Sequence, residues 1–212
     1  MSSFNPMPLA RRIAGGAVRL ESWYFDKKHN VETRAEEEEQ QARNTDLSAG
    51  FWYLPTRPAT VRLLLSELPM RDYSNYTFID LGSGKGRVLL IAAEYGFQKI
   101  VGVELKKDLH ERAVRNIRNC RGLKKECGGM ECLNLNALDY DFPDENLVLY
   151  FFNPFGNEIM QALLNRLNAS LDRCPRDVFL ATVYPEHVSA VDAMPRWGVY
   201  KELRRCRIYR IR

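Results

Sequence analysis

The sequence predicts an α/β protein built on a doubly wound, mostly parallel β-sheet, and three features of the chain favour this fold class. Short apolar runs alternate with helical patterns through the middle of the chain, as they do in parallel sheets with helices on both faces. Residues 147–152 are apolar without interruption, which is typical of a central strand covered on both sides. Between the strand-like run 77–81 and a helical pattern that starts at residue 87, glycine stands at every second position, which indicates a ligand-binding turn.

Residues 1–46 differ in character from the rest of the chain. Apolar and basic side chains mix along them, which favours a basic amphipathic helix, and residues 36–39 are all glutamates. We expect a helical extension over 1–46 that packs against a domain spanning 47–212. A lid over the substrate is one alternative, and a helix on a membrane surface is another, which the acidic run disfavours.

A loop rich in aromatic residues and proline is expected over residues 47–58, and a helix over residues 58–68. Proline is tolerated in the first turn of that helix, whose inward face carries Val61, Leu64 and Leu65. The aromatic side chains of the loop are candidates for a functional surface. Alternatively, they attach the N-terminal extension to the core.

The remaining elements follow from hydrophobic periodicity. The expected order is helix 87–95, strand 99–104, helix 107–119, strand 130–135, strand 147–152, helix 158–171 and strand 178–183. The inward face of helix 107–119 is expected to carry Leu109, Ala113, Val114 and Ile117. Residues 199–211 are strand-like with interspersed arginines, and we expect an antiparallel pair at one sheet edge, where charge guards against edge pairing.

The composition limits the class of protein. The chain has 212 residues, of which 45% are hydrophobic and 27% charged, enough for one sizeable core. A net charge of +4 without a concentrated basic face argues against nucleic acid as a partner. The five cysteines, with no secretory signal, indicate a reduced, cytoplasmic protein, and their spacing favours no metal centre. No apolar run reaches the ~18 residues that a membrane span needs.

The glycine loop has the pattern Gly82-x-Gly84-x-Gly86. It does not fit a dinucleotide fingerprint, because Arg87 stands where that fingerprint requires its third glycine. Asp80 comes just before the turn. An acid at this place repels a pyrophosphate and suits a ligand that carries an ammonium group.

A second acid, Glu104, ends the next strand, about 20 residues past the loop, where a carboxylate can bind ribose hydroxyls. A ligand that combines ribose, a positively charged amino acid end and no phosphate is S-adenosylmethionine. The alternative is a left-handed turn that binds no ligand, and the presence of both acids disfavours it.

These motifs resemble those of the class I S-adenosylmethionine-dependent methyltransferases. Asp80 and the three glycines match their motif I, acid-x-Gly-x-Gly-x-Gly, and Glu104 ends a strand similar to their motif II. The resemblance covers about residues 50–185 and implies a Rossmann-like, seven-stranded sheet, S-adenosylmethionine as cofactor and methyl transfer as the reaction. In that family the segment before motif I crosses the methionine end of the cofactor. The candidate cofactor-binding residues are Tyr53, Thr56, Asp80, Gly82, Ser83, Gly84, Gly86, Glu104, Leu105, Asn136, Ala137 and Asn153.

The end of the third strand departs from the family pattern. The family often has Gly-Asp-Ala here, and its acid accepts a hydrogen bond from the adenine amino group. This chain has Asn136 before Ala137. An amide oxygen can accept the same bond, and Asp139 is a nearby alternative.

The stretch 152–156, Phe-Asn-Pro-Phe-Gly, resembles motif IV of amino methyltransferases, although one proline of that motif is missing. There the asparagine and a carbonyl hold the target N–H groups and the aromatic ring stacks on the target. The candidate catalytic residues are therefore Asn153, Pro154 and Phe155. The nearest likeness is to the class I, non-SET lysine methyltransferases, which share the loop, the strand end and this type of motif IV. The alternative is an Asx-type turn that ends the strand.

The resemblance implies transfer of a methyl group to a nitrogen acceptor, with a protein lysine as one candidate. Methylation of a small molecule on oxygen or nitrogen is an alternative. From another class, the chain could be a non-catalytic protein that binds S-adenosylmethionine or, through its C-terminal arginines, nucleic acid. Such a protein would not need motif IV. Tyr184 and His187 are further candidates to face the pocket, and the sequence leaves the oligomeric state open.

Overall fold

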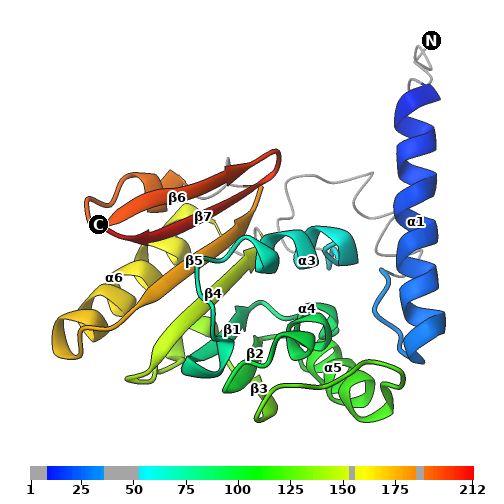
Figure 1. The fold of residues 1–212 in the computed structure, drawn as a ribbon, viewed down its shortest axis with the longest axis horizontal. Helices are drawn as coiled ribbons and strands as arrows, with labels where there is room; N and C mark the ends of the chain where they lie inside the picture. The colour runs from blue at the N-terminus through cyan, green and yellow to red at the C-terminus, as the bar shows by residue number, and fades with distance from the viewer. Residues whose placement is uncertain (1–8, 36–52, 153–155, 185–188) are drawn as a thin grey trace.

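A seven-stranded sheet forms the centre of the computed structural model, which describes residues 9–35, 53–152, 156–184 and 189–212 (Figure 1). Across the sheet the strands are β3 (Met130–Asn134), β2 (Lys99–Glu104), β1 (Tyr76–Leu81), β4 (Asn146–Phe152), β5 (Val178–Val183), β7 (Cys206–Ile211) and β6 (Trp197–Leu203). Strands β1 to β5 pair in parallel, whereas β7 pairs antiparallel with β5 and with β6. The predicted mostly parallel, doubly wound sheet with an antiparallel edge is confirmed.

Most helices lie where hydrophobic periodicity predicts them. They are α1 (Leu9–His29), α3 (Pro58–Ser66), α4 (Arg87–Ala92), α5 (Lys107–Asn119), α6 (Asn157–Arg173) and α7 (Ser189–Asp192), with short 3-10 helices η1 (Tyr73–Asn75), η2 (Ala93–Tyr95) and η3 (Ala137–Asp139). The boundaries of β2, α5 and β5 are those predicted, and most other predicted elements of residues 58–211 differ by a residue or two. The exception is the helix predicted over 87–95, whose last three residues form the 3-10 helix η2 instead of continuing α4. The short helix α7 was not predicted.

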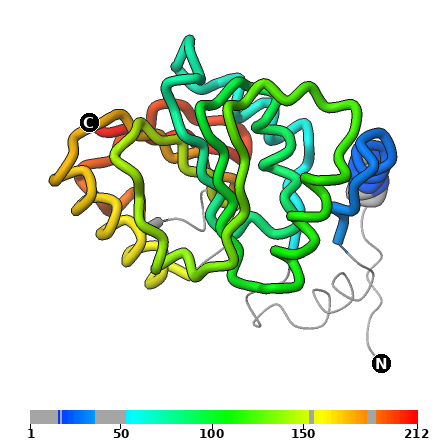
Figure 2. Tube along the Cα trace, turned by 90° about the horizontal axis from the view of Figure 1, so that it is seen from below, coloured from blue at the N-terminus to red at the C-terminus, as the bar shows by residue number. Residues whose placement is uncertain are grey.

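Two apolar clusters lie on the two faces of the sheet. Side chains of α3 and α4 pack with one set of strand residues, and side chains of α6 and α7 pack with the alternate set. Figure 2 shows the yellow helix α6 and the cyan-to-green helices α3 to α5 on opposite sides of the sheet. Because side chains alternate along a strand, Asp80 lies on the α4 face together with Phe78, whereas Ile79 and Leu81 lie on the other face.

The predicted inward face of α5 is partly wrong. Leu109 and Ala113 are buried, but Val114 is 44% exposed and the polar Asn116 is buried instead. The reason is a tertiary contact. The Asn116 side chain bonds to the backbone of Glu32, which lies over this side of α5, so an amide has hydrogen-bonding partners there that a valine would leave unpaired.

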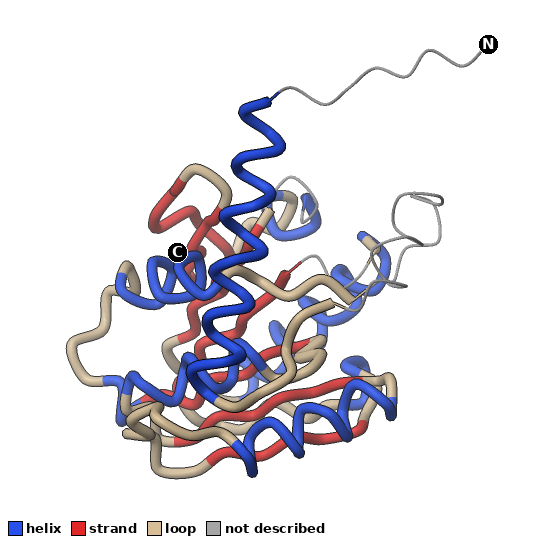
Figure 3. The backbone as a smooth tube through the Cα atoms, turned by 90° about the vertical axis from the view of Figure 1, so that its right-hand side faces the viewer, coloured by secondary structure: helices blue, strands red, loops and turns tan. Residues whose placement is uncertain are grey.

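The N-terminal arm, residues 9–35, consists of α1 and a short extended segment. Figures 1 and 3 show α1 beside the sheet, with its N-terminal half standing clear of the rest of the chain. Phe25 and Val31 are buried against the α4 face, whereas Leu20, Trp23 and Tyr24 are exposed. The predicted helix is present, but residues 36–52 lie outside the described part of the chain. None of the described helices is long and apolar enough to cross a membrane.

Candidate active site

The glycine loop between β1 and α4 adopts the backbone conformation that its sequence requires. Gly82, Gly84 and Gly86 have φ angles of +89°, +54° and +81°, in the left-handed region that favours glycine. The N–H groups of Gly82 and Ser83 both donate to the carbonyl of Val103, at 2.8 and 3.0 Å. The loop is therefore fixed against the carboxyl end of β2, and Gly86 caps the start of α4.

Glu104 joins this loop to the end of β2. Its Oε2 accepts a hydrogen bond from the N–H of Gly84 at 2.8 Å, and its Oε1 accepts one from the N–H of Lys106 at 2.8 Å. Each carboxylate oxygen keeps a lone pair for a further donor, such as a ribose hydroxyl. The next residue, Leu105, is 66% exposed, so the β2 exit is open to a ligand. Asn134 holds this exit by donating to the carbonyls of Glu104 and Leu105.

Asp80 is a buried carboxylate near a second carboxylate. It is 3% exposed, and among the described residues its side chain makes no hydrogen bond. Burial, with a smaller contribution from the charge of Glu104, raises the pKa of Asp80 well above its usual range. The hydroxyl of Ser83, in the same loop, is also buried without a hydrogen-bond partner. A bound ammonium group would offset the repulsion at Asp80, so these residues fit a ligand with a cationic amino end.

Tyr53 covers the glycine loop. A Cβ on Gly84 would lie 2.3 Å from the Cε2 of Tyr53, so only glycine permits this approach of the ring to the backbone. The Tyr53 hydroxyl donates to the carbonyl of Thr33 at 2.8 Å, and the Lys85 ammonium lies 4.8 Å from the centre of the ring. The ring of Tyr53, a candidate cofactor-binding residue, therefore lies directly on the glycine loop.

Thr56 reaches the fourth strand. Its hydroxyl lies 2.7 Å from the hydroxyl of Tyr150, which sits in register beside Asp80. Complete burial raises the pKa of Tyr150 well above 10, so its hydroxyl stays protonated and one of the two hydroxyls donates to the other. The sequence does not predict Tyr150 as a site residue, because Tyr150 is one of six consecutive apolar residues in an expected central strand.

Asn136 and Ala137 follow β3 beside the β2 exit. The N–H of Leu135 donates to the carbonyl of Glu104 at 3.1 Å, which places this turn next to the end of β2. The Asn136 side chain is exposed and accepts a hydrogen bond from the N–H of Leu138 at 3.0 Å, so it caps the 3-10 turn that starts at Ala137. Its amide oxygen keeps one lone pair for another donor.

The predicted catalytic residues Asn153, Pro154 and Phe155 lie outside the described part of the chain, as does His187. Their neighbours are described. The ring of Phe152, at the end of β4, lies 5.6 Å from the ring of Tyr184, which follows β5.

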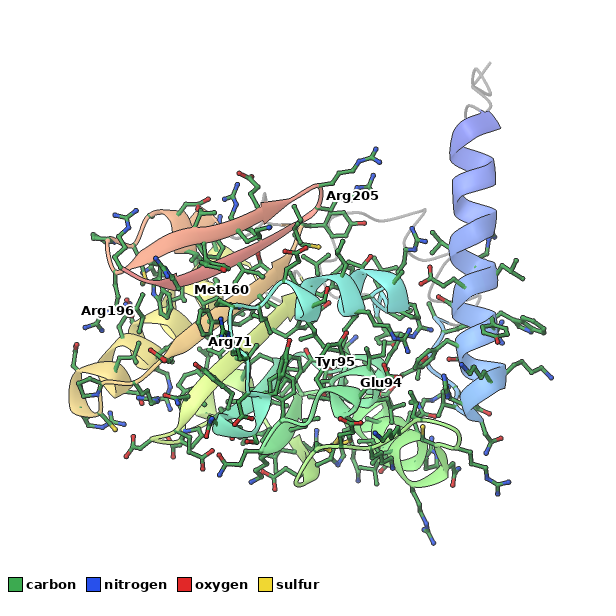
Figure 4. All side chains as sticks on the ribbon, in the orientation of Figure 1. Arg71, Glu94, Tyr95, Met160, Arg196 and Arg205 are labelled. Atoms are coloured by element: carbon green, nitrogen blue, oxygen red, sulfur yellow. The ribbon has the colours of Figure 1, made fainter. Side chains whose placement is uncertain are left out.

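Tyr184 has a left-handed backbone with a φ of +57°, which is uncommon for an aromatic residue. Arg205 stacks over its ring at 5.7 Å. Figure 4 shows Arg205 extending beyond the tip of the β6–β7 hairpin. The rings of Phe152 and Tyr184 and the guanidinium of Arg205 therefore lie together next to the carboxyl end of β4.

Arg87 is a buried, hydrogen-bonded residue to which the sequence analysis assigned no role. It is 2% exposed, and its guanidinium donates to the Thr33 hydroxyl at 2.7 Å, to the Ser22 hydroxyl at 3.0 Å and to the Thr56 carbonyl at 3.2 Å. Asp26 lies 3.7 Å away as counter-ion. The only signal in the sequence was an arginine where dinucleotide loops have glycine.

Comparison with known proteins agrees with this geometry. A family model described as histone methylation protein DOT1 matches residues 48–153, half of the chain. No match was found among curated proteins.

Solved structures of methyltransferases share the fold. An RNA methyltransferase from Salinibacter ruber, in complex with S-adenosyl-L-homocysteine, is 22% identical over 74% of this chain and 92% of its own, with a TM-score of 0.51. A ribosomal protein L11 methylase from Lactobacillus delbrueckii subsp. bulgaricus is 17% identical over 72% of this chain and 76% of its own, with a TM-score of 0.50.

A SAM-dependent methyltransferase from Leishmania major is 12% identical over 73% of this chain and 71% of its own, also with a TM-score of 0.50. At these identities the likeness shows the fold, and the family match supplies the chemistry. The predicted resemblance, enzyme class and cofactor are confirmed. The chain belongs to the DOT1 family of histone methylation proteins and is a class I S-adenosylmethionine-dependent methyltransferase.

Proposed function

We propose that this enzyme methylates a nitrogen acceptor and that the acceptor is a lysine side chain of a protein. The observation that carries the proposal is the family match, which runs from residue 48 to residue 153. The match spans the glycine loop, Glu104 and the motif IV asparagine. The description of the family names a protein, histone, as the molecule that is methylated. We do not assign a histone as the acceptor, because residues 154–212 lie outside the match.

In the proposed cofactor site, residues at the ends of three strands each bind a different part of the ligand. Asp80 and the glycine loop, with Ser83, take the cationic amino acid end, and Glu104 takes the ribose hydroxyls. Leu105, Asn136 and Ala137 border the adenine. Tyr53 and Thr56 close the site over the methionine end. The buried, unbonded Asp80 carboxylate and the close approach of Tyr53 to Gly84 support this division.

Motif IV is proposed to orient the acceptor. S-adenosylmethionine supplies a methyl group already activated on a sulfonium, so the protein has mainly to align a nucleophile with it. Asn153 and an adjacent carbonyl would hold the N–H groups of the target, Pro154 would fix the turn, and Phe155 would stack on the target. Alignment of this kind can contribute up to about 7–11 kcal/mol to lowering a barrier.

The acceptor amine must lose a proton before it can attack. Among the described residues, the two histidines lie on helices, His29 on α1 and His110 on α5, and neither follows a strand end of the site. We therefore propose that the proton passes to solvent and that motif IV orients the neutral amine.

The division of the chain is also a proposal. A catalytic domain over residues 47–212 with an N-terminal extension over residues 1–46 is supported by the start of the family match at residue 48.

The acceptor class can be tested with methyl-labelled S-adenosylmethionine and fractionated cell extract. Labelled protein whose acid hydrolysate contains methyl-lysine is the expected result. Label confined to small molecules or RNA would contradict a protein acceptor. Label in protein that mild base releases would indicate an ester and would contradict a nitrogen acceptor.

A further inference from the structure

The N-terminal arm is bonded to the glycine loop by a buried network. The Arg87 guanidinium, in the first turn of α4, donates to the hydroxyls of Ser22 and Thr33. Asp26 closes the network, because its Oδ1 accepts from the Thr33 hydroxyl at 2.5 Å and lies 3.7 Å from Arg87. All four side chains are at least nine-tenths buried. A charged group is stable at such a site only when it is paired and hydrogen-bonded. Burial of Arg87 therefore depends on the arm, and burial of Asp26 depends on α4.

A second attachment holds residues 30–35, which we call the docking segment. Asn116 of α5 accepts from the Glu32 N–H at 2.8 Å and donates to the Glu32 carbonyl at 3.1 Å. Its amide also donates to the carbonyl of Lys85 in the glycine loop at 2.9 Å. The Lys85 ammonium in turn donates to the carbonyl of Arg34 at 3.0 Å. The docking segment is therefore fixed to the loop from both sides of Thr33.

Tyr53 takes its position from this segment. Its hydroxyl donates to the carbonyl of Thr33, the residue that Arg87 holds from its side chain. Its ring lies on Gly84, at a distance that no larger residue would permit. Thr33 is thus held through its side-chain hydroxyl by Arg87 and orients Tyr53 through its backbone carbonyl.

We propose that the N-terminal arm is part of the cofactor site and that Arg87 and Thr33 are positioning residues that hold Tyr53 over the glycine loop. The proposal rests on the cofactor role proposed above for Tyr53. The chain of contacts is continuous: α4 holds the docking segment, the docking segment holds the Tyr53 hydroxyl, and the Tyr53 ring covers the loop that receives the amino acid end of S-adenosylmethionine. Loss of any one of these contacts lets the Tyr53 ring move. Cofactor binding must then order the ring, which makes the free energy of binding less favourable.

The test is a double-mutant cycle read by calorimetric titration with S-adenosylmethionine. Arg87 is left in place, because removing it would leave Asp26 buried without a cation. Thr33→Val removes the hydroxyl that Arg87 holds and keeps the shape of the side chain. Tyr53→Phe removes only the hydroxyl that bonds to the arm. Each single variant is expected to weaken cofactor binding roughly three- to tenfold, a change equivalent to about one buried hydrogen bond.

The cycle separates positioning from a general loss of structure. If Thr33 acts through Tyr53, Thr33→Val should weaken binding less than about twofold in the Tyr53→Phe background. Tyr73→Phe is the matched control, because the Tyr73 hydroxyl also donates to a backbone carbonyl at 2.8 Å, that of Leu65, away from the loop. It should leave cofactor affinity unchanged.

Two results would overturn the proposal: wild-type affinity in Tyr53→Phe, or effects of the two variants that simply multiply in the double variant. Either result would stand whatever the methyl acceptor is, because the measurement is of cofactor binding alone. Failure of the proposed lysine acceptor would leave this experiment unaffected.

Discussion

The carboxylate of Glu104 and the N–H of Gly84 are joined by a 2.8 Å hydrogen bond that ties the end of β2 to the glycine loop after β1. The other carboxylate oxygen accepts from the N–H of Lys106. Two oxygens that each accept a backbone hydrogen bond cannot be replaced by an amide, because the amide nitrogen would turn a donor toward another donor. The structure of the loop therefore depends on the same side chain that we propose to bind the ribose of the cofactor.

Glu104→Gln should lower cofactor affinity by roughly 10- to 100-fold and the free energy of unfolding by about 1–3 kcal/mol, the cost of an unmatched buried hydrogen bond. Titration calorimetry and urea unfolding measure the two effects. The matched control is Glu131→Gln on β3, where Glu131 forms a half-exposed ion pair with Lys99. That pair should contribute less than ~1 kcal/mol. Equal affinity for the cofactor in Glu104→Gln and the wild type would contradict the role of Glu104.

Asp80 should make the stability of the ligand-free protein depend on pH. Its pKa in the folded chain is raised well above 3.8, so the folded protein keeps a proton that the unfolded chain releases. Stability is then lost as pH rises from about 4 through the raised pKa. Asp80→Asn, which cannot ionise, should flatten this fall and raise the melting temperature at neutral pH.

The same carboxylate gives cofactor binding the opposite dependence on pH. An ammonium group pairs with ionised Asp80, so affinity for S-adenosylmethionine should rise as pH increases from about 4 through the raised pKa of Asp80. Asp80→Asn should weaken binding at every pH. Thermal melts and titrations from pH 4 to 8 measure both trends. Asp141→Asn, at an exposed carboxylate, is the control. Parallel pH profiles of Asp80→Asn and the wild type would refute this account of Asp80.

Gly84→Ala should impair both folding and cofactor binding. The residue has a φ of +54°, and its Cβ would lie 2.3 Å from the Tyr53 ring, so the backbone strain of ~1–2 kcal/mol adds to displacement of the ring. Gly129→Ala is the control, since a Cβ there meets nothing within 4 Å. Unfolding curves and titrations compare the two variants. Normal cofactor binding by Gly84→Ala would show that Tyr53 need not lie on the loop.

Asn153→Ala should reduce turnover far more than it reduces cofactor affinity. The proposed role of Asn153 is to hold the acceptor nitrogen, and misplacement of a reactant by about 1 Å can cost ~100-fold in rate. Single-turnover rates with labelled cofactor and a binding titration separate the two effects. A parallel loss of turnover and affinity would instead assign Asn153 to the cofactor.

Hydrophobic period and turn chemistry predicted the fold of the middle of the chain well. The boundaries of β2 and α5 follow from strong local patterns that end at polar residues, and the left-handed loop follows from glycine at alternate positions. Glu104 could be placed beside the loop because neighbouring parallel strands end at the same edge of a sheet. Local sequence was sufficient wherever one element alone sets the environment of a residue.

Local sequence was insufficient where a distant segment decides the environment. Val114 was predicted to be buried and is exposed, and Asn116 is buried because the backbone of Glu32, 84 residues earlier, lies over it. The partners of Arg87 come from α1, from the docking segment and from the loop at Thr56. No periodicity in the chain connects these segments, so the contacts between the arm and Arg87 could be found only in three dimensions.

The most direct test of the central claim is a crystal structure of the protein with S-adenosyl-L-homocysteine bound. We expect the ribose hydroxyls within hydrogen-bond distance of the Glu104 carboxylate and the amino group beside Asp80, at about 2.7–3.2 Å. A complex in which the sugar and the amino group both lie away from these two carboxylates would contradict the claim.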